Sequence, residues 1–193
     1  MNILIVAATK SEITSKVILS NNILITGVGM INTAINLTKE LMRKRYDLVI
    51  NMGIAGSFNK ELKNGFVVEV IEDNFSEIGF EDDLNFSSFK NFEIKTKFNV
   101  EGKTELKKVR GITVNTVHGN RTSISKIIQR EDPDTESMEG AATFKVCEEF
   151  GIACIQIRSI SNKVEVRDKS KWDIDLAIRN LNFEVEKIIN YET

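Results

Sequence analysis

The chain has 193 residues, of which 28% are charged and 41% hydrophobic, and its formal net charge is −2. This length fits a single domain, residues 1–193, which can bury roughly 70% of its unfolded surface without disulfide or metal support. Basic and acidic residues alternate along the chain, which argues against a nucleic-acid partner. No apolar run reaches the length needed to span a membrane, so no membrane association is expected.

The cysteine and histidine content argues against a metal site. Cys147 and Cys154 lie in apolar runs without CxxC spacing, and His118 is the single histidine. Neither a metal nor a cofactor is therefore expected. Unpaired cysteines are typical of reducing compartments, and the apolar N-terminal segment lacks the flanks of a signal peptide. The sequence thus predicts a cytoplasmic protein.

Apolar runs and helical periodicity alternate along the chain. Strands are expected at residues 2–8, 22–28, 47–53, 66–72, 111–117, 134–138 and 152–160, and helices at 31–44, 140–150 and 171–190. Continuous Val, Ile and Leu runs indicate strands covered on both faces. This order predicts an α/β fold, a single-domain three-layer sandwich with a central mixed, mainly parallel sheet. Residues 74–108 fit no period and are expected to hold loops and antiparallel excursions.

The first motif is GVGMIN at residues 27–32, which follows a strand and opens a helix. It resembles a dinucleotide-binding turn, but Asn32 occupies the third glycine position and no acid ends the next strand. A tight glycine turn between strand and helix is therefore favoured over NAD binding.

Two further motifs lie where predicted strands end. NMGIAGSF, residues 51–58, is a small-residue loop that would let a flat ring or a sugar approach the backbone, or else an ordinary turn. ESMEGAA, residues 136–142, places Glu139 between a short strand and a helix. Its carboxylate either stabilises the helix N-terminus or accepts hydrogen bonds from two sugar hydroxyls, with Met138 beneath the sugar.

Two polar residues complete the candidate site. Glu12 follows the first strand, where an acid is ordinarily a solvated loop residue. Asn162 ends the apolar segment IACIQIRSISN, and its amide offers both a donor and an acceptor. An amide at this position suggests that a ligand is recognised there.

Taken together, these motifs resemble the nucleoside phosphorylase and nucleosidase superfamily, and within it the futalosine hydrolase family. The segments ITGVGM, NMGIAGSF, GITVNTVHGN, ESMEGAA and RSISNKVE carry the resemblance and occur in the same order. The resemblance extends over nearly the whole chain. It implies a nucleoside phosphorylase-like fold and a homo-oligomer that acts on a small nucleoside.

The resemblance also implies residue roles. Glu12 corresponds to the base that activates water, and Asn162 to the residue that contacts the leaving purine. Glu139 would bind the ribose hydroxyls, with Met138 against the sugar. The remaining implied substrate contacts are Ala55, Gly56, Thr116, Val117 and His118. For His118 a structural role is an equal alternative.

The implied reaction is hydrolysis of an N-ribosidic bond through an oxocarbenium-like transition state. The phosphorylase branch holds phosphate with an arginine in the loop after the first strand. Here that loop is AATKSEI, with Glu12 and no arginine, which favours water as the nucleophile.

The identity of residue 162 bears on the substrate. Methylthioadenosine/S-adenosylhomocysteine nucleosidases carry Asp at this position, which matches adenine. An amide can donate to O6 of a 6-oxopurine and accept from N7–H, so Asn162 favours hypoxanthine as the leaving base. The expected reaction is release of hypoxanthine and dehypoxanthine futalosine in the alternative menaquinone pathway. The alternatives are a methylthioadenosine-type nucleosidase and a non-catalytic purine nucleoside binding module. Arg158, Lys163 or Arg167 would hold the substrate's carboxyphenyl tail.

Overall fold

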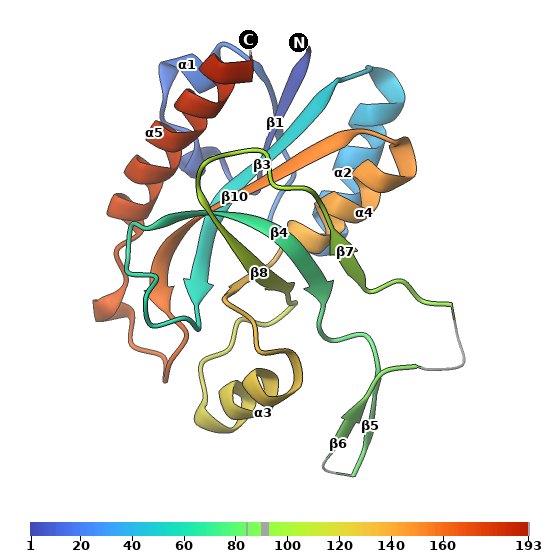
Figure 1. Ribbon diagram of the computed structural model, residues 1–193, viewed down its shortest axis with the longest axis vertical. Coiled ribbons are helices and arrows are strands. Elements are labelled where there is room, and N and C mark those ends of the chain that lie inside the picture. Colours follow the sequence, from blue (N-terminus) through green and yellow to red (C-terminus); the bar gives the residue numbers. More distant parts are fainter. Residues whose placement is uncertain (84, 90–92, 193) are drawn as a thin grey trace.

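A computed structural model describes residues 1–83, 85–89 and 93–192 of the chain. Figure 1 traces its elements from the N-terminus to the C-terminus. The strands are β1 (Ile3–Ala7), β2 (Asn22–Ile25), β3 (Leu48–Ser57), β4 (Val67–Phe75), β5 (Phe80–Asp82), β6 (Asn85–Ser87), β7 (Lys97–Asn99), β8 (Lys107–Thr113), β9 (Thr135–Ser137) and β10 (Ala153–Lys163). The helices are η1 (Lys10–Glu12), α1 (Lys16–Leu19), α2 (Met30–Arg43), α3 (Arg121–Glu131), α4 (Gly140–Phe150), η2 (Lys169–Lys171) and α5 (Ile174–Glu192).

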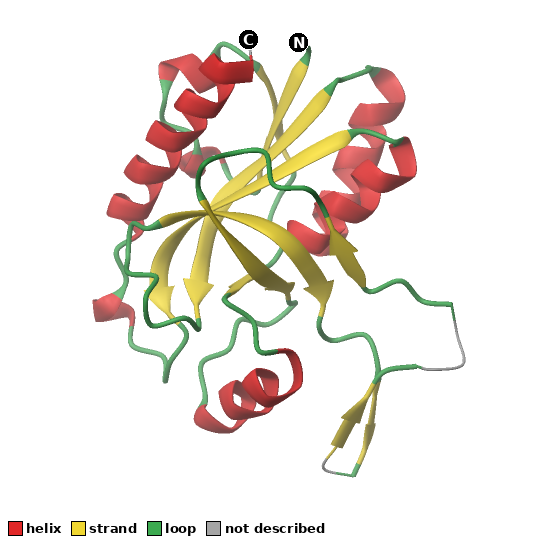
Figure 2. Cartoon of the chain, viewed as in Figure 1, coloured by secondary structure: helices red, strands yellow, loops and turns green. Residues whose placement is uncertain are grey.

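Two apolar cores lie on opposite faces of the parallel strands β2, β1, β3 and β10. Ile3 and Ile5 of β1 pack toward α5, whereas Leu4 and Val6 pack toward α2 and α4. Figure 2 shows the helices on both sides of these strands. Because successive side chains of a strand point to opposite faces, a strand covered twice must be apolar throughout. The continuous apolar run of β1 is therefore explained by helices that cover both faces of the strand, as the sequence predicts.

The sheet is mixed and mainly parallel, as predicted. β1 pairs in parallel with β2 and β3, β10 with β3, and β8 with both β4 and β9. β4 pairs antiparallel with β10 and β7, and β3 antiparallel with β9. The pairings β3–β10–β4–β8–β9–β3 return to their starting strand. The predicted sandwich did not include this closed ring of strands. The ring forms because β3 pairs with β1 along its first half and with β9 at its last residues.

The strand and helix predictions are confirmed with shifted ends. The helix expected at 140–150 is α4, whose bounds are the same, and the run expected at 111–117 ends four residues early at Thr113. Residues 54–57, expected as a loop, continue β3 because β10 runs beside them. Helix α3 was not predicted. Its apolar pattern is weak, and Ile127 is its one fully buried residue.

Residues 74–108 contain the antiparallel pairs that were expected there. β5 and β6 form a hairpin that projects from the body in Figure 1, and β7 lies along β4. Residues 84 and 90–92 of this region lie outside the described residues. Among the described helices, none is long and apolar enough to cross a membrane.

One buried side chain of α5 fixes the loop that follows β1. The Asn182 side chain accepts hydrogen bonds from the backbone N–H groups of Thr14 and Ser15, at 2.9 and 3.1 Å. Its amide nitrogen donates to the carbonyl oxygens of Glu12, at 2.9 Å, and Ile178, at 2.8 Å. Asn182 therefore connects the C-terminal helix to the loop that carries Glu12.

We expect Asn182→Ala to lower the free energy of unfolding by about 2–3 kcal/mol, because buried backbone groups lose their partners. Urea unfolding monitored by circular dichroism measures this change. The matched control is Asn180→Ala, on the same helix, which removes a single bond to the Gly65 carbonyl. Its expected cost is about 1 kcal/mol. Equal losses in both variants would contradict the role assigned to Asn182.

Candidate active site

The candidate site lies at the ends of β1, β3, β9 and β10, and Glu12 enters it from η1. Glu12 is buried, with 8% of its surface exposed. Its Oε2 accepts hydrogen bonds from the backbone N–H of Thr9, at 2.8 Å, and from the Thr9 hydroxyl, at 3.1 Å. A methyl group on Gly53 would lie 3.0 Å from Glu12 Oε1. The glycine therefore leaves room for the carboxylate against β3.

Arg158 occupies the centre of the site. It is 1% exposed, and its guanidinium donates to the side-chain and backbone oxygens of Asn51 and to the Ile157 carbonyl. Burial lowers its pKa, while the charges of Glu139, Asp73 and Glu12 raise it. The cation thus lies among three acids of the site, from η1, β4 and the start of α4.

Glu139 is held at the N-terminus of α2 rather than at its own helix. Its Oε1 accepts a hydrogen bond from the backbone N–H of Gly29, at 2.9 Å. Burial raises the pKa of Glu139, the Arg158 charge and the Gly29 bond lower it, and Glu12 raises it again. Gly29 has a positive φ of 96°, a conformation that glycine adopts without strain. The GVGMIN motif therefore forms the predicted turn, and the turn also binds the acid.

Asp73 is linked to the start of α4 by hydrogen bonds through Thr113. The Asp73 side chain accepts hydrogen bonds from Thr113, at 2.9 Å, and Gln156, at 2.8 Å. Thr113 Oγ1 in turn accepts from the backbone N–H of Ala141, at 2.7 Å. A Cβ at Gly140 would collide with Asp73 and Gln156, so glycine is required there. This network fixes the segment that presents Met138 and Glu139.

A second group of polar residues surrounds Gly56. Gly56 pairs with Asn162 on β10 and with Glu136 on β9. A Cβ at Gly56 would lie 3.4 Å from both Asn162 Nδ2 and Glu136 Cγ. The register of β10 shifts between Ile160 and Asn162, and this irregularity places the Asn162 amide beside Gly56. Ser161 Oγ donates to Asn162 Oδ1, at 2.8 Å, and Asn162 Nδ2 donates to the Lys163 carbonyl, at 2.9 Å.

Residues 116–118 lie in a loop beyond β8, so Thr116 and Val117 are not in the strand that was expected at 111–117. Thr116 is exposed, and Val117 is half-buried against the small core of Ile112, Val114 and Ile127. His118 faces Glu136: its Nδ1 lies 2.6 Å from Glu136 Oε2, and its backbone N–H donates to Glu136 Oε1 at 3.1 Å. The structure therefore places His118 beside Glu136, which pairs with Gly56, and the sequence interpretation had given Glu136 no role.

Two other expected contacts are placed differently. The Ala55 side chain is buried in a core cluster with Val68, Val109 and Ile160, on the face of β3 opposite Gly56. Ala55 therefore contributes backbone but no side chain to the site, because neighbouring residues of a strand face opposite ways. Met138 is half-buried between β9 and α4.

Of the three cations considered for the substrate tail, Arg158 is excluded from the surface by its burial. Lys163 is exposed, and Arg167 lies over the Trp172 ring at 4.9 Å. An arginine inside an otherwise apolar strand was the sequence signal for a buried charge. Asp73 and Glu136 gave no such signal, since their partners come from distant strands.

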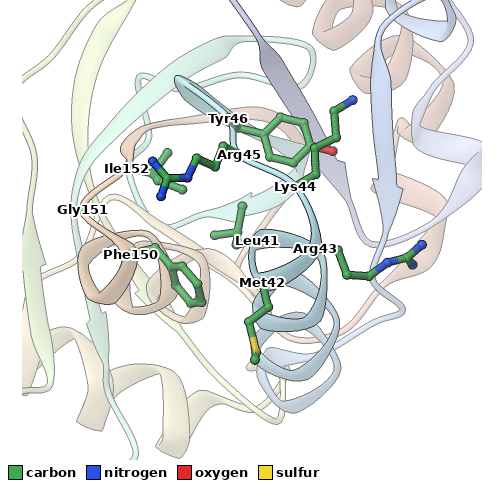
Figure 3. A pocket seen from close by; sticks show the side chains of 9 residues that line it. All are labelled: Leu41, Met42, Arg43, Lys44, Arg45, Tyr46, Phe150, Gly151 and Ile152. Atoms are coloured by element: carbon green, nitrogen blue, oxygen red, sulfur yellow. The ribbon is translucent and has the colours of Figure 1, made fainter.

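A cavity of about 690 Å³ lies at the opposite ends of β3 and β10. Figure 3 shows that it is lined by the C-terminal ends of α2 and α4 and by the segment before β3. Arg43, Lys44 and Arg45 stand there beside helix C-termini, whose partial negative charge favours cations. None of the predicted site residues lines this cavity.

Comparison with known proteins places the fold. A sequence model of the phosphorylase superfamily matches residues 20–190. The chain therefore belongs to the phosphorylase superfamily. A futalosine hydrolase structure from Helicobacter pylori has a TM-score of 0.83 at 16% identity, covering 98% of this chain and 97% of that one. A Helicobacter pylori methylthioadenosine nucleosidase with 5′-methylthioadenosine in the active site gives 0.85 at 16%, covering 98% of each chain.

Curated relatives point to a particular class of enzyme. The futalosine hydrolase of Thermus thermophilus is 26% identical over 86% of this chain and 80% of its own length. The methylthioadenosine/S-adenosylhomocysteine nucleosidase of Psychromonas ingrahamii is 27% identical over 85% of this chain and 78% of its own. Both are nucleosidases, which confirms the predicted class of N-glycosyl hydrolase. The two relatives are named for different substrates, so the comparison leaves the substrate open.

We expect the free energy of unfolding to depend on pH because of Asp73. Burial raises the pKa of Asp73 to about 6, although hydrogen bonds from Gln156 and Thr113 and the Arg158 charge lower it. The folded protein thus binds this proton more tightly than the unfolded chain does. The contribution of Asp73 to stability is therefore greatest below about pH 4 and falls as the pH rises through about 6.

Asp73→Asn tests this dependence, because Gln156 Oε1, which is buried without a partner, can accept the new amide N–H. The free energy of unfolding of the unmodified protein relative to Asp73→Asn should fall by about 2–3 kcal/mol between pH 4 and pH 7. Urea unfolding at several pH values measures it. Parallel pH curves for the two proteins would contradict the prediction.

Proposed function

We propose that the protein hydrolyses the N-ribosidic bond of futalosine, releasing hypoxanthine and dehypoxanthine futalosine in the alternative menaquinone pathway. The observation that carries the proposal is the placement of two acids, the buried Glu12 and the half-buried Glu139, around Arg158, with the Asn162 amide beside Gly56. In this proposal Glu12 activates the water, Glu139 binds the sugar, and the Asn162 amide contacts the leaving base.

Glu12 is the proposed general base. It takes a proton from water as the oxygen attacks C1′ and the bond between C1′ and N9 breaks. The Thr9 contacts use Oε2, which leaves Oε1 on the Gly53 side to face the water. Positioned acid–base assistance of this kind is typically worth about 10²- to 10⁴-fold.

Glu139 is the proposed partner of the ribose hydroxyls, with Met138 against the sugar. Its carboxylate uses Oε1 for the Gly29 N–H, so Oε2 is directed to the substrate. The positive charge of Arg158 favours the ionised form of Glu139, which opposes the effect of burial. An ionised acid near the sugar also stabilises the positive charge that develops on the ring in the transition state.

Asn162 is the proposed contact of the leaving purine. Its existing bonds to Ser161 and Lys163 use one lone pair of the oxygen and one N–H of the amide. The second lone pair accepts from N7–H of hypoxanthine, and the second N–H donates to O6. An amide has no acidic proton to give, so the N7 proton comes from solvent. Adenine, whose 6-amino group is a donor, leaves this N–H unpaired.

Methylthioadenosine/S-adenosylhomocysteine nucleosidase is the second candidate function, because relatives of that name match the chain at similar identity. A non-catalytic nucleoside binding module is the third. Purified protein given futalosine and methylthioadenosine separately, in phosphate-free buffer, distinguishes them by the free base released. Faster release of adenine favours the second candidate, and tight binding without turnover favours the third.

The predicted homo-oligomer and cytoplasmic location belong to the same proposal. Ile31, Ile35 and Met42 form a row on α2 and are 68, 48 and 74% exposed. A second copy of the chain would cover such a row. Both free cysteines are buried, as suits a reducing compartment.

Glu12→Gln should lower kcat for futalosine by about 10²- to 10⁴-fold, because an amide cannot accept the proton of water. Substrate binding should change little. Hypoxanthine release and titration calorimetry measure the two quantities, and Glu61→Gln, at an exposed surface acid, is the control. Unchanged turnover in Glu12→Gln would remove Glu12 from the mechanism.

Asn162→Asp should lower the preference for hypoxanthine over adenine nucleosides by about 10- to 100-fold. The reason is that a protonated acid matches adenine, and a mispaired buried group costs about 1–3 kcal/mol. The measurement is the ratio of kcat/KM for futalosine and methylthioadenosine. A ratio that does not move would show that residue 162 does not read the base.

A further inference from the structure

Glu136 is a buried acid that has no role in the proposed reaction. Glu136 of β9 is 3% exposed, and both of its oxygens face His118. Its Oε1 accepts the backbone N–H of His118 at 3.1 Å, and its Oε2 lies 2.6 Å from the ring Nδ1. One acid therefore fixes both the backbone and the ring of the single histidine.

The contact decides which nitrogen of the neutral ring carries the proton. An ionised carboxylate has acceptors only, so Nδ1 must be the donor. The proton is then on Nδ1, and Nε2 presents a lone pair. No hydrogen bond within the described part of the chain uses Nε2, and the side chain is 13% exposed. The ring of Phe58 packs edge-on against it, with centroids 6.1 Å apart, and restricts its rotation.

The acid that holds this ring lies beside the amide that is proposed to contact the base. Glu136 and Asn162 flank Gly56 on neighbouring strands, each 3.4 Å from the position of a Cβ on that glycine. The loop of His118 also follows the segment after Asn162, because the Arg167 backbone N–H donates to the Gly119 carbonyl at 3.1 Å. The histidine and the amide are thus neighbours in one site.

We propose that Glu136 is a positioning residue that holds His118 as the Nδ1–H form, so that Nε2 accepts a hydrogen bond from N1–H of a 6-oxopurine. The inference rests on the proposed nucleosidase function and extends its selectivity. Hypoxanthine carries a donor at N1, whereas N1 of adenine is an acceptor. Two acceptors facing each other in a buried site cannot pair, so the histidine rejects adenine.

The ring proton can be observed directly. His118 is the only histidine in the sequence, so its two ring nitrogens give a single pair of ¹⁵N signals. At about pH 8, where a free imidazole is neutral, we expect the unmodified protein to show the Nδ1–H form. Added hypoxanthine should shift the Nε2 signal, and added adenine at equal occupancy should not. An Nε2–H form, or an Nε2 signal that does not respond to hypoxanthine, overturns the proposal.

Glu136→Gln should exchange the proton between the two nitrogens. The Gln oxygen can keep the backbone N–H of His118, while its NH2 donates to Nδ1 and moves the ring proton to Nε2. The ratio of kcat/KM for futalosine and methylthioadenosine should then fall by about 10- to 100-fold. An equal loss for both substrates would mean a structural role only and would overturn the proposal.

Glu77→Gln is the matched control, because Glu77 also accepts a backbone N–H of this loop, that of Asn115 at 2.8 Å. It should leave both the ring tautomer and the substrate ratio unchanged. The NMR readout with free bases needs no turnover. If futalosine is not cleaved but hypoxanthine still shifts Nε2, the proposed reaction fails and the role of His118 stands. If futalosine is cleaved and Nε2 does not respond, the reverse holds.

Discussion

The site depends on Arg158, the one buried lysine or arginine among the residues that the structure describes. Arg158 lies inside β10, and a guanidinium without solvent is unfavourable unless it is hydrogen-bonded and surrounded by negative charge. Asn51 and the Ile157 carbonyl accept its hydrogens, and Glu139, Asp73 and Glu12 supply the charge. The same arrangement explains the acids. Burial raises the pKa of Glu139 and that of Asp73, and the Arg158 charge lowers both.

The three acids reach this cation from separate parts of the chain, and each is fixed by its own support. Glu12 is held through Thr9 and the Asn182 anchor, and Glu139 through the Gly29 turn. Asp73 is held by Thr113 and Gln156. A Cβ at Gly53 would crowd Glu12 at 3.0 Å, one at Gly140 would collide with Asp73, and one at Gly56 would collide with Val164 at 2.9 Å. The motifs rich in glycine therefore have a packing cause as well as a chemical one.

The candidate site has two groups of polar residues, which are joined by β3. Glu12, Glu139 and Arg158 gather near Gly53, and Asn162, Glu136 and His118 gather near Gly56. These two glycines are three residues apart on one strand. Because both groups contact the same strand, β3 fixes the distance between them. The start of α4 supplies Glu139 to the first group, and β9 supplies Glu136 to the second.

The sequence by itself determined the α/β class and most strand and helix positions, because apolar runs are local signals, and its ordered motifs identified Glu12 and Glu139 as candidate site acids. The tertiary structure decided the rest. Closure of the sheet through β9 brings Glu136 beside Gly56 and turns His118 toward the site. It also buries Arg158, which the sequence interpretation named as a candidate partner of the substrate's tail, and it places the Ala55 side chain in the core. Such outcomes follow from strand pairing between distant segments, and a linear pattern does not encode which strands become neighbours.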